Sequence, residues 1–421
     1  MAPTLEAPET TSQLVNDGLK RTITKTAPSL IPNGVHALPE LDASRLTTTL
    51  TSHPRSVPLP DSDEVKAQRT CTDHMVTAQW TLSAGWAAPE LKPYGPLSLM
   101  PTSSCLHYAT ECFEGMKLYR GFDGRLRLFR PSLNCRRMLV SSTRIALPSF
   151  PPAELEQLII ALCARDGPKW LPKERPGSFL YIRPTMIGND PALGVQKPKE
   201  ALLYIIVACF PNMSAGTGPK PGMKLLASQE DMVRAWPGGF GYAKVGANYG
   251  PSLLAQGEAR AKGYDQILWL FGEDCEVTEA GASNFFVVWR TREGGLQLVT
   301  APLGEKIILD GVTRRSVLEL ARERLSGRDE ELEAVEVVER KFQMHELVEA
   351  VEEGRLVEAF AAGTAFFIAP IAAISFRGKD LKIPMAKGDT GAYAGAIKTW
   401  LMDIMYGRCQ HEWGVVIEEE E

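Results

Sequence analysis

The stretch PGGFGYAKVGANYG, residues 237–250, contains one lysine, Lys244, among glycine, alanine and aromatic residues. Glycines let the backbone pass close to a bulky ligand and adopt positive φ angles. Because no charged residue lies within several positions of Lys244, a fold that shields it from water would leave its amine available as a nucleophile. The stretch therefore indicates a lysine that forms a Schiff base. A surface lysine in a glycine-rich loop is an equally good alternative.

The composition is ordinary for a globular protein. The chain has 421 residues, enough for two domains, of which 44% are hydrophobic and 23% are charged. A net charge of -5 without a basic stripe argues against a nucleic-acid partner, and no apolar run is long enough to span a membrane. Eight cysteines without a C-x-x-C spacing and six dispersed histidines argue against a metal site.

The first 45 residues are rich in serine, threonine and proline and predict a flexible extension. Glu6, Glu9 and Asp17 argue against a mitochondrial transit peptide, because such peptides are poor in acidic residues. We therefore expect a cytoplasmic location, with a mitochondrial location as the alternative.

Alternating strand and helix patterns predict an α/β protein of two domains. The expected segments are helices at 152–167, 250–263, 313–327 and 392–408, and strands at 124–131, 178–188, 201–210, 265–272, 285–290 and 362–374. The predicted bounds are 1–45 for the extension, 46–210 for a smaller N-terminal domain, 211–224 for a linker rich in proline and glycine, and 225–421 for a larger C-terminal domain with Lys244. We expect the site between the domains, where cofactors commonly bind.

Three further features suit a cofactor that reacts with Lys244. Glu279 directly precedes a predicted strand, where it is either a turn residue or a functional carboxylate. Val312 and Thr313 begin a predicted helix, and the turn at 363–365 consists of small residues; each is an ordinary cap or turn, or an anion site. Pyridoxal 5′-phosphate would use all of them, through its aldehyde, its pyridine nitrogen and its phosphate.

Seven segments occur in the order found in one family: TDHM, LHYATECFEGMKLYRG, RLFRPSLNCRRM, LYIRPTMIGNDPALGV, RAWPGGFGYAKVGANYGPS, VTEAGASNFFVVW and DGVTRRSVLELA. The chain resembles the branched-chain amino acid aminotransferases of class IV, over residues 41–416. The resemblance implies a fold type IV, mixed α/β enzyme that uses pyridoxal 5′-phosphate.

The resemblance also implies the residues of the site. Lys244 would form the Schiff base and move the proton. The implied cofactor contacts are Arg137, Lys244, Tyr249, Glu279, Val312, Thr313 and Thr364. The implied substrate contacts are Phe113, Tyr181, Arg183 and Ala365 of one subunit and Tyr108, Leu193 and Val195 of the other, which implies an obligate homodimer. The backbone at 364–365 would receive the substrate carboxylate, and Arg183 would suit the distal carboxylate of 2-oxoglutarate.

The implied reaction is a ping-pong transfer of the amino group between leucine, isoleucine or valine and 2-oxoglutarate, in the biosynthesis or catabolism of these amino acids. The alternatives are a D-amino acid or amine transaminase, a relative of aminodeoxychorismate lyase, or a protein of this fold that binds without catalysing.

The chain departs from the family pattern at a few positions. Ala282 stands where many members have a threonine beside the cofactor, and Phe366 and Ala369 stand in place of a redox C-x-x-C. Ala67 and Cys71 stand where the family usually has phenylalanines. These two positions predict a larger side-chain pocket and a widened substrate range, unless a neighbouring residue refills the space.

Overall fold

The computed structural model describes residues 38–211, 222–327 and 332–420. Pro39–Glu421 form one compact unit. Residues 1–37 of the predicted extension at 1–45 and most of the predicted linker at 211–224 lie outside the described residues, whereas Ala43–Arg45 of the extension form a short helix, η1. In the ranges that are described, no helix has the length and apolar character needed to cross a membrane.

The first of two sheets has ten strands in the order β1-β4-β2-β9-β8-β6-β7-β19, with β3 paired to β2 and β5 to β8. Its strands are β1 (Thr47–Thr48), β2 (His74–Thr81), β3 (Gly85–Trp86), β4 (Glu90–Pro93), β5 (Glu111–Phe113), β6 (Met116–Arg120), β7 (Leu126–Phe129), β8 (Phe179–Gly188), β9 (Glu200–Cys209) and β19 (Gly414–Ile417). Most neighbours run antiparallel, and β8 pairs with β9 along its whole length.

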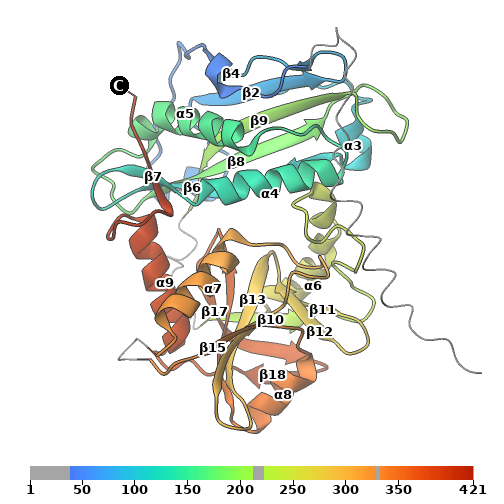
Figure 1. Ribbon diagram of the computed structural model, residues 1–421, viewed down its shortest axis with the longest axis vertical. Coiled ribbons are helices and arrows are strands. Elements are labelled where there is room, and N and C mark those ends of the chain that lie inside the picture. The colour runs from blue at the N-terminus through green and yellow to red at the C-terminus, as the bar shows by residue number, and fades with distance from the viewer. Residues whose placement is uncertain (1–37, 212–221, 328–331, 421) are drawn as a thin grey trace, which may run out of the picture. The chain divides into compact units, whose positions relative to one another are not determined.

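Helices cover one face of this sheet (Figure 1). They are α4 (Pro131–Arg144) and α5 (Pro152–Trp170), and the shorter η1 (Ala43–Arg45), α2 (Asp63–Lys66) and α3 (Ser104–Tyr108) lie in the same part of the chain. Leu155, Leu158, Ile159 and Leu162 recur on one side of α5 and join the core beneath it. The predicted helix end at Gly167 is wrong, because α5 continues to Trp170. Gly167 is a packing residue: a Cβ there would lie 2.5 Å from Leu126 Cδ1.

The second sheet has nine strands in the order β12-β11-β10-β17-β16-β13-β14-β15, with β18 paired to β17. Its strands are β10 (Met223–Ala227), β11 (Gln266–Phe271), β12 (Glu276–Ala280), β13 (Ser283–Arg290), β14 (Leu296–Thr300), β15 (Glu336–Glu339), β16 (Leu356–Gly363), β17 (Phe367–Phe376) and β18 (Lys379–Lys382). The helices of this part are η2 (Gly246–Asn248), α6 (Ser252–Ala261), α7 (Val312–Arg324), α8 (Met344–Glu352) and α9 (Ala392–Met405).

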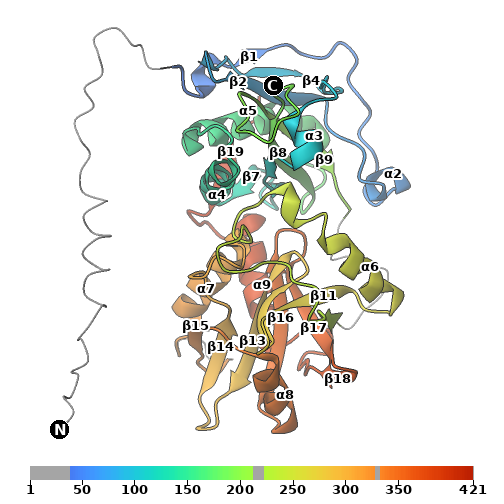
Figure 2. The ribbon, with the colours of Figure 1, turned by 90° about the vertical axis from the view of Figure 1, so that its right-hand side faces the viewer.

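Both faces of β13 are buried, which explains its unbroken apolar run. Phe286 and Val288 pack with α7 and α9, whereas Phe285 and Val287 pack in a separate core with α8. The strand therefore has α7 and α9 on one face and α8 on the other; these elements are labelled in Figure 2. The end of β12, the end of β16 and the start of α7 meet near the first sheet.

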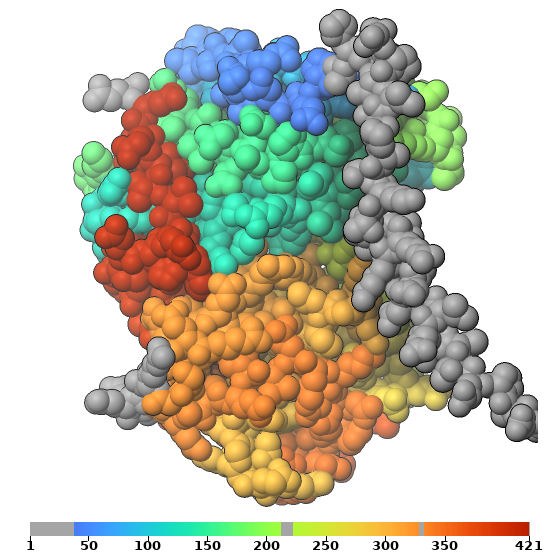
Figure 3. All heavy atoms as spheres, in the orientation of Figure 1, coloured from blue at the N-terminus to red at the C-terminus, as the bar shows by residue number. Residues whose placement is uncertain are grey.

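The chain returns to the first sheet at its end. After α9, β19 pairs antiparallel with β7, so Val416 lies opposite Arg127. In Figure 3 the C-terminal segment is coloured red and lies along one side of the molecule. The last strand of the predicted C-terminal domain thus belongs to the sheet of the predicted N-terminal domain, and the domain bounds remain a prediction.

Candidate active site

A cavity of about 470 Å³ lies where segments of both sheets meet. The first sheet and α4 supply aromatic and arginine side chains, and the second sheet supplies small residues and amide groups. The residues from the predicted site that line this cavity are Phe113, Arg137, Tyr181, Arg183, Lys244, Tyr249, Val312, Thr313, Thr364 and Ala365. Most of the predicted site, from six separate stretches of sequence, is therefore brought to one place.

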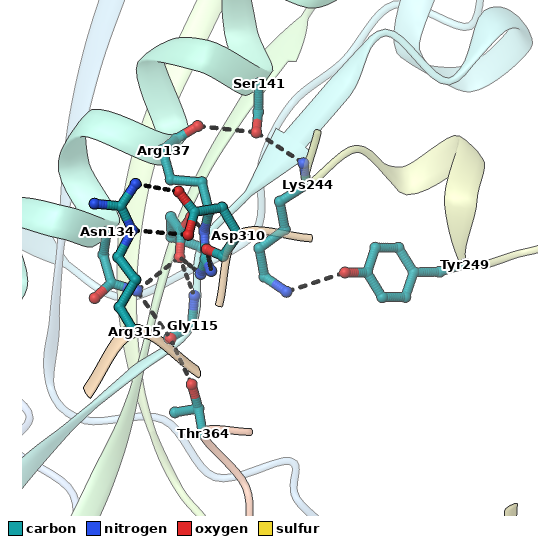
Figure 4. A network of polar contacts seen from close by, with 10 residues as sticks. Gly115, Asn134, Arg137, Ser141, Lys244, Tyr249, Asp310, Arg315 and Thr364 are labelled. Atoms are coloured by element: carbon teal, nitrogen blue, oxygen red, sulfur yellow. Dashed lines mark hydrogen bonds and ion pairs between the residues drawn. The ribbon is translucent and has the colours of Figure 1, made fainter. Parts of the chain in front are cut away.

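The side chain of Lys244 points to a tyrosine (Figure 4). Its Nζ donates a hydrogen bond to the hydroxyl of Tyr249 at 3.0 Å and lies 4.8 Å from the ring centroid of Phe113. Its backbone N–H donates to Ser141 Oγ at 2.8 Å, which fixes the start of the side chain. No carboxylate of the described ranges forms an ion pair with Lys244. The amine is therefore held in the cavity by a hydroxyl and is not neutralised by an acid.

Glu279 lies at the end of β12, with 1% of its surface exposed. Its Oε1 accepts hydrogen bonds from Leu309 N at 3.1 Å and Asn284 Nδ2 at 3.2 Å. Its Oε2 lies 2.6 Å from Arg234 Nη1, yet it accepts no well-directed hydrogen bond. Arg234 and Glu279 thus form an ion pair with poor hydrogen-bond geometry. Burial raises the pKa of Glu279, while the charge of Arg234 lowers it. Glu279 does not itself line the cavity, but Ala280 and Asn284 beside it do, and its Oε2 can still accept a hydrogen bond.

Arg137 is fixed on α4 by a buried acid. Its Nε and Nη2 donate to the two oxygens of Glu114 at 2.7 and 2.8 Å, and its Nη1 donates to the carbonyl of Asp310 at 2.9 Å. Asn134 donates a further hydrogen bond to Glu114 at 2.8 Å. Burial raises the pKa of Glu114, but Arg137 together with Lys244 and Asn134 lowers it by more in sum, so that the pKa lies below its usual value. The guanidinium is oriented before any ligand binds.

The N-terminus of α7 lies beside Arg137. Gly311 is its N-cap residue and provides no side-chain acceptor for the first amides of the helix, at Val312 and Thr313. A Cβ at Gly311 would lie 2.1 Å from Asn284 Oδ1, so only glycine fits at this position. Free amides, the positive end of the helix dipole and an arginine together suit a phosphate group.

A second group of free amides lies at the turn between β16 and β17. Thr364 and Ala365 line the cavity, and the hydroxyl of Thr364 donates to the carbonyl of Gly115 at 3.4 Å. Within the described parts of the chain, no acceptor is found for the backbone N–H groups of Thr364 and Ala365. The turn can therefore bind a carboxylate through its backbone.

Arg183 lies against two aromatic rings on the first sheet. Its guanidinium carbon is 4.7 Å from the ring centroid of Phe113 and 5.2 Å from that of Tyr181. Its Nη2 donates to the hydroxyl of Tyr181 at 3.3 Å, and its buried Nε has no hydrogen-bond partner. This wall of the cavity presents both apolar rings and a cation.

Three predicted substrate contacts do not line the cavity. Tyr108, Leu193 and Val195 are 40%, 55% and 85% exposed, and the hydroxyl of Tyr108 donates to the carbonyl of Leu193. They lie outside the cavity of their own chain, and their assignment to the site of a second subunit stays a prediction.

The enlargement expected from Ala67 and Cys71 is not found in the wall of this cavity, and the widened substrate range stays a prediction. Ala282, Phe366 and Ala369 line it, but Ala67 and Cys71 do not. Ala67 is an exposed residue at the C-terminal end of α2, and Cys71 is buried in a bridge with Ala208. The missing phenylalanine rings therefore leave no gap in its wall.

Sequence reasoning missed several residues around the cavity. They are Glu114, Asn134, Arg234, Gln266 and Lys117. Glu114 and Lys117 stand in the segment ECFEGMK, where three charged residues alternate with apolar residues and a glycine in a strand pattern. That pattern was a usable signal, because charged residues in a buried strand need partners.

The donors and acceptors fit pyridoxal 5′-phosphate. Lys244 offers an amine for the aldehyde, Glu279 Oε2 offers an acceptor for the ring nitrogen, and the amides at Val312 and Thr313 with Arg137 suit the phosphate. Tyr249 stands beside Lys244, where its hydroxyl can contact the ring hydroxyl.

Comparison with known proteins supports this fit. Residues 111–374 match the sequence model of the family described as Amino-transferase class IV. Enzymes of this family use pyridoxal 5′-phosphate, which confirms the predicted cofactor. A solved branched-chain amino acid aminotransferase from Thermobaculum terrenum, in its pyridoxal-phosphate form, superimposes with a TM-score of 0.61. It is 24% identical and covers 82% of this chain and 98% of its own. The shared architecture confirms the predicted fold class.

Curated relatives are more similar in sequence. The mitochondrial branched-chain-amino-acid aminotransferase of Schizosaccharomyces pombe is 42% identical over 405 residues, which cover 96% of this chain and 90% of the relative. The cytosolic enzyme of Saccharomyces cerevisiae is 44% identical over 387 residues, which cover 91% and 99%. Together with the class IV match and the cavity around Lys244, these relatives show that the chain belongs to the branched-chain-amino-acid aminotransferases.

Proposed function

We propose that this enzyme transfers the amino group between L-leucine, L-isoleucine or L-valine and 2-oxoglutarate. The observation that carries the proposal is the wall formed by Phe113, Tyr181 and Arg183. Its rings offer an apolar surface to a branched side chain, and its cation suits the distal carboxylate of 2-oxoglutarate. One wall can thus receive both partners of a ping-pong reaction in turn.

The bound cofactor supplies an electron sink that weakens the bond between Cα and its hydrogen. Lys244 anchors the cofactor and then moves the proton from Cα, while Tyr249 orients its amine. Glu279 keeps the ring nitrogen protonated. Arg137, Val312, Thr313 and Thr364 hold the phosphate end, and the amides at Thr364 and Ala365 receive the substrate carboxylate.

A substrate panel tests the proposal. The holoenzyme is incubated separately with L-leucine, D-alanine and an (R)-amine, with 2-oxoglutarate as acceptor and glutamate formation as the readout. We expect activity on L-leucine to dominate. Activity restricted to D-alanine and the amine would overturn the assignment.

We further propose that the enzyme acts as a homodimer in which Tyr108, Leu193 and Val195 complete the cavity of the partner. Their exposure outside their own cavity supports this role. Mixing a Lys244→Ala chain with a Tyr108→Ala chain should restore activity, because one site of each mixed dimer then has both residues intact. An absence of recovery after verified subunit exchange would refute it.

We place the enzyme in the cytoplasm. The proposal is supported by Glu6, Glu9 and Asp17, which lie outside the described residues. Relatives occur in both compartments. Fusion of residues 1–45 to a fluorescent protein tests the proposal, and import of the fusion into mitochondria would refute it.

A further inference from the structure

Lys117 is a buried lysine without an acidic partner. It lies on β6 with 3% of its surface exposed, and its Nζ donates a hydrogen bond to the carbonyl of Ala365 at 2.9 Å. The ring centroids of Phe179 and Phe367 lie 4.0 and 4.3 Å from the same nitrogen. Across the described ranges, no carboxylate forms an ion pair with it. Its surroundings are therefore two aromatic faces and one carbonyl.

This environment is a costly one for an ammonium group. A buried charge is normally paired, since transfer from water to a protein interior is strongly unfavourable. A methionine would fill the space between Phe179 and Phe367 without that cost. The stability of β6 alone therefore does not account for a lysine at position 117. The contact that a methionine could not make is the hydrogen bond from Lys117 to the carbonyl of Ala365.

Lys117 touches the turn between β16 and β17 at two points. It holds the carbonyl of Ala365, and it lies over the ring of Phe367, two residues further along. Phe367 has a φ angle of 60°, in the left-handed region that bulky residues rarely adopt. The contacts at Ala365 and at the strained residue itself restrain how the chain leaves the turn. They also fix the direction in which the amides at Thr364 and Ala365 point.

Lys117 is not part of the cavity wall, but it contacts the turn that is. Thr364 and Ala365 line the cavity, whereas Lys117 does not. Its Nζ contacts the carbonyl of Ala365, in the peptide group that directly follows the two amides without an acceptor. At such a distance in a low dielectric, a positive charge favours an anion at those amides even without contact.

We propose that Lys117 is a positioning residue that orients the Thr364–Ala365 turn to bind the α-carboxylate common to the amino-acid and oxo-acid substrates. This inference rests on the proposed function, in which the turn receives that carboxylate. Because both half-reactions use the same carboxylate, Lys117 acts in both. A residue that recognised only the distal carboxylate of 2-oxoglutarate would act in one.

The experiment compares the wild-type holoenzyme with Lys117→Met. The probe is 4-methylpentanoate, which has the carbon chain and carboxylate of leucine without the amino group, titrated while the absorbance of the bound cofactor is followed. We expect its Kd to rise at least tenfold. The KM values for leucine and for 2-oxoglutarate should rise together, while kcat stays within threefold and cofactor retention is unchanged.

A matched control is available in Lys169→Met. Lys169 also combines a polar contact, to Asp73 Oδ2 at 2.6 Å, with a ring, that of Trp170 at 5.4 Å, and it is remote from the turn in sequence and contacts. We expect this control to leave the Kd of 4-methylpentanoate unchanged. Lys117→Gln, which keeps a donor for the Ala365 carbonyl without the charge, should show a smaller rise than Lys117→Met.

Several results would overturn the inference: an unchanged Kd in Lys117→Met, an equal rise in the Lys169 control, loss of cofactor in parallel with loss of the probe, or a wild type that does not bind the probe. Should Lys117→Met fail to fold, Lys117→Gln decides, with a wild-type Kd against the inference and a rise of threefold or more in its favour. A wild type that binds the probe but does not transaminate leucine would refute the proposed substrates and not the role of Lys117.

Discussion

Each end of the cavity depends on a buried cation, and the two cations are stabilised in opposite ways. Arg137, at the proposed phosphate end, is paired through two hydrogen bonds with Glu114 and has a third to the carbonyl of Asp310. Lys117, behind the proposed carboxylate end, has one carbonyl and two aromatic rings. Burial lowers the pKa of Lys117 to about 7.

The different surroundings of Arg137 and Lys117 correspond to how long each proposed ligand, the cofactor phosphate or the substrate carboxylate, stays bound. A cofactor phosphate remains through every turnover, so its end of the cavity gains from a rigid, electrically neutral frame that is complete beforehand. A substrate carboxylate arrives and leaves in each half-reaction. A single uncompensated positive charge behind free amides attracts such an anion without holding it through many contacts.

The largest effect is expected at Lys244, which acts in the reaction itself and belongs to neither end of the cavity. Lys244→Ala removes the amine that binds the cofactor and moves the proton, so transamination of leucine should fall by about 10³-fold or more. Neither Arg137 nor Lys117 contacts Lys244 Nζ, so 4-methylpentanoate should still bind to the variant supplied with cofactor. Turnover near the wild-type rate would show that the assignment of Lys244 is wrong.

Glu114→Gln breaks the frame at the phosphate end. Removal of one partner from a buried ion pair leaves Arg137 uncompensated, and we expect a loss of about 3 kcal/mol in the free energy of unfolding, together with weaker cofactor binding. Urea denaturation and cofactor titration measure the two effects. Glu333→Gln is the matched control, because Glu333 pairs with Arg290 in the same bidentate way at the surface and should change little.

The same variant has a defined pH signature. The pKa of Glu114 is lower in the folded protein than its usual 4.5, so its contribution to stability is present above the unfolded value and is lost as the pH falls through the folded value. The wild type should therefore lose its advantage over Glu114→Gln below about pH 4.5. A difference in stability that is constant across this range would contradict the pairing.

The pH dependence at the carboxylate end should be smaller and of opposite direction. Lys117 is charged below a pKa of about 7. Its neighbours are the Ala365 carbonyl, the Phe179 and Phe367 rings and, across the strand pair, Tyr181. The Kd of 4-methylpentanoate should rise severalfold in the wild type as the pH increases through 7, relative to Lys117→Met. If the Kd of 4-methylpentanoate depends on pH in the same way in the wild type and in Lys117→Met, the charge of Lys117 does not affect binding at the turn.

The smallest effect is expected for Ala67→Phe. Ala67 is exposed and does not line the cavity, so a phenylalanine ring there touches neither end. The ratio of kcat/KM for phenylalanine to that for leucine should change by less than about twofold, whereas a ring that entered a hydrophobic pocket would shift it by tenfold or more. A fall of that size would restore the hypothesis of an enlarged pocket.

Local patterns predicted several elements: β8 and α7 carry the periodicity of a strand and of a helix, and β13 is a short unbroken apolar run bounded by polar residues. The residues placed around Lys244 were reached through motifs that retain their order along the chain. The contact between Lys117 and Ala365 was not predictable in this way, because it joins residues 248 positions apart. In sequence, MKLYR is typical of a strand with a lysine facing water, and only the packing of the turn against β6 shows otherwise. The predicted helix end at Gly167 was wrong for the same reason, because this glycine is required by its packing against Leu126, which is distant in sequence.

The pairing of β7 with β19 has a consequence for synthesis on the ribosome. Arg120, the last residue of β6, pairs with Glu419, 299 residues later, and β19 pairs with β7, so one edge of the first sheet stays open until residues 414–419 have been synthesised. Nascent chains therefore expose β7 as an unpaired edge strand until β19 is made, and a chain cut off before β19 keeps this edge open. β19 and the ion pair at Glu419 therefore close this edge of the sheet only after the other strands of the sheet have been made.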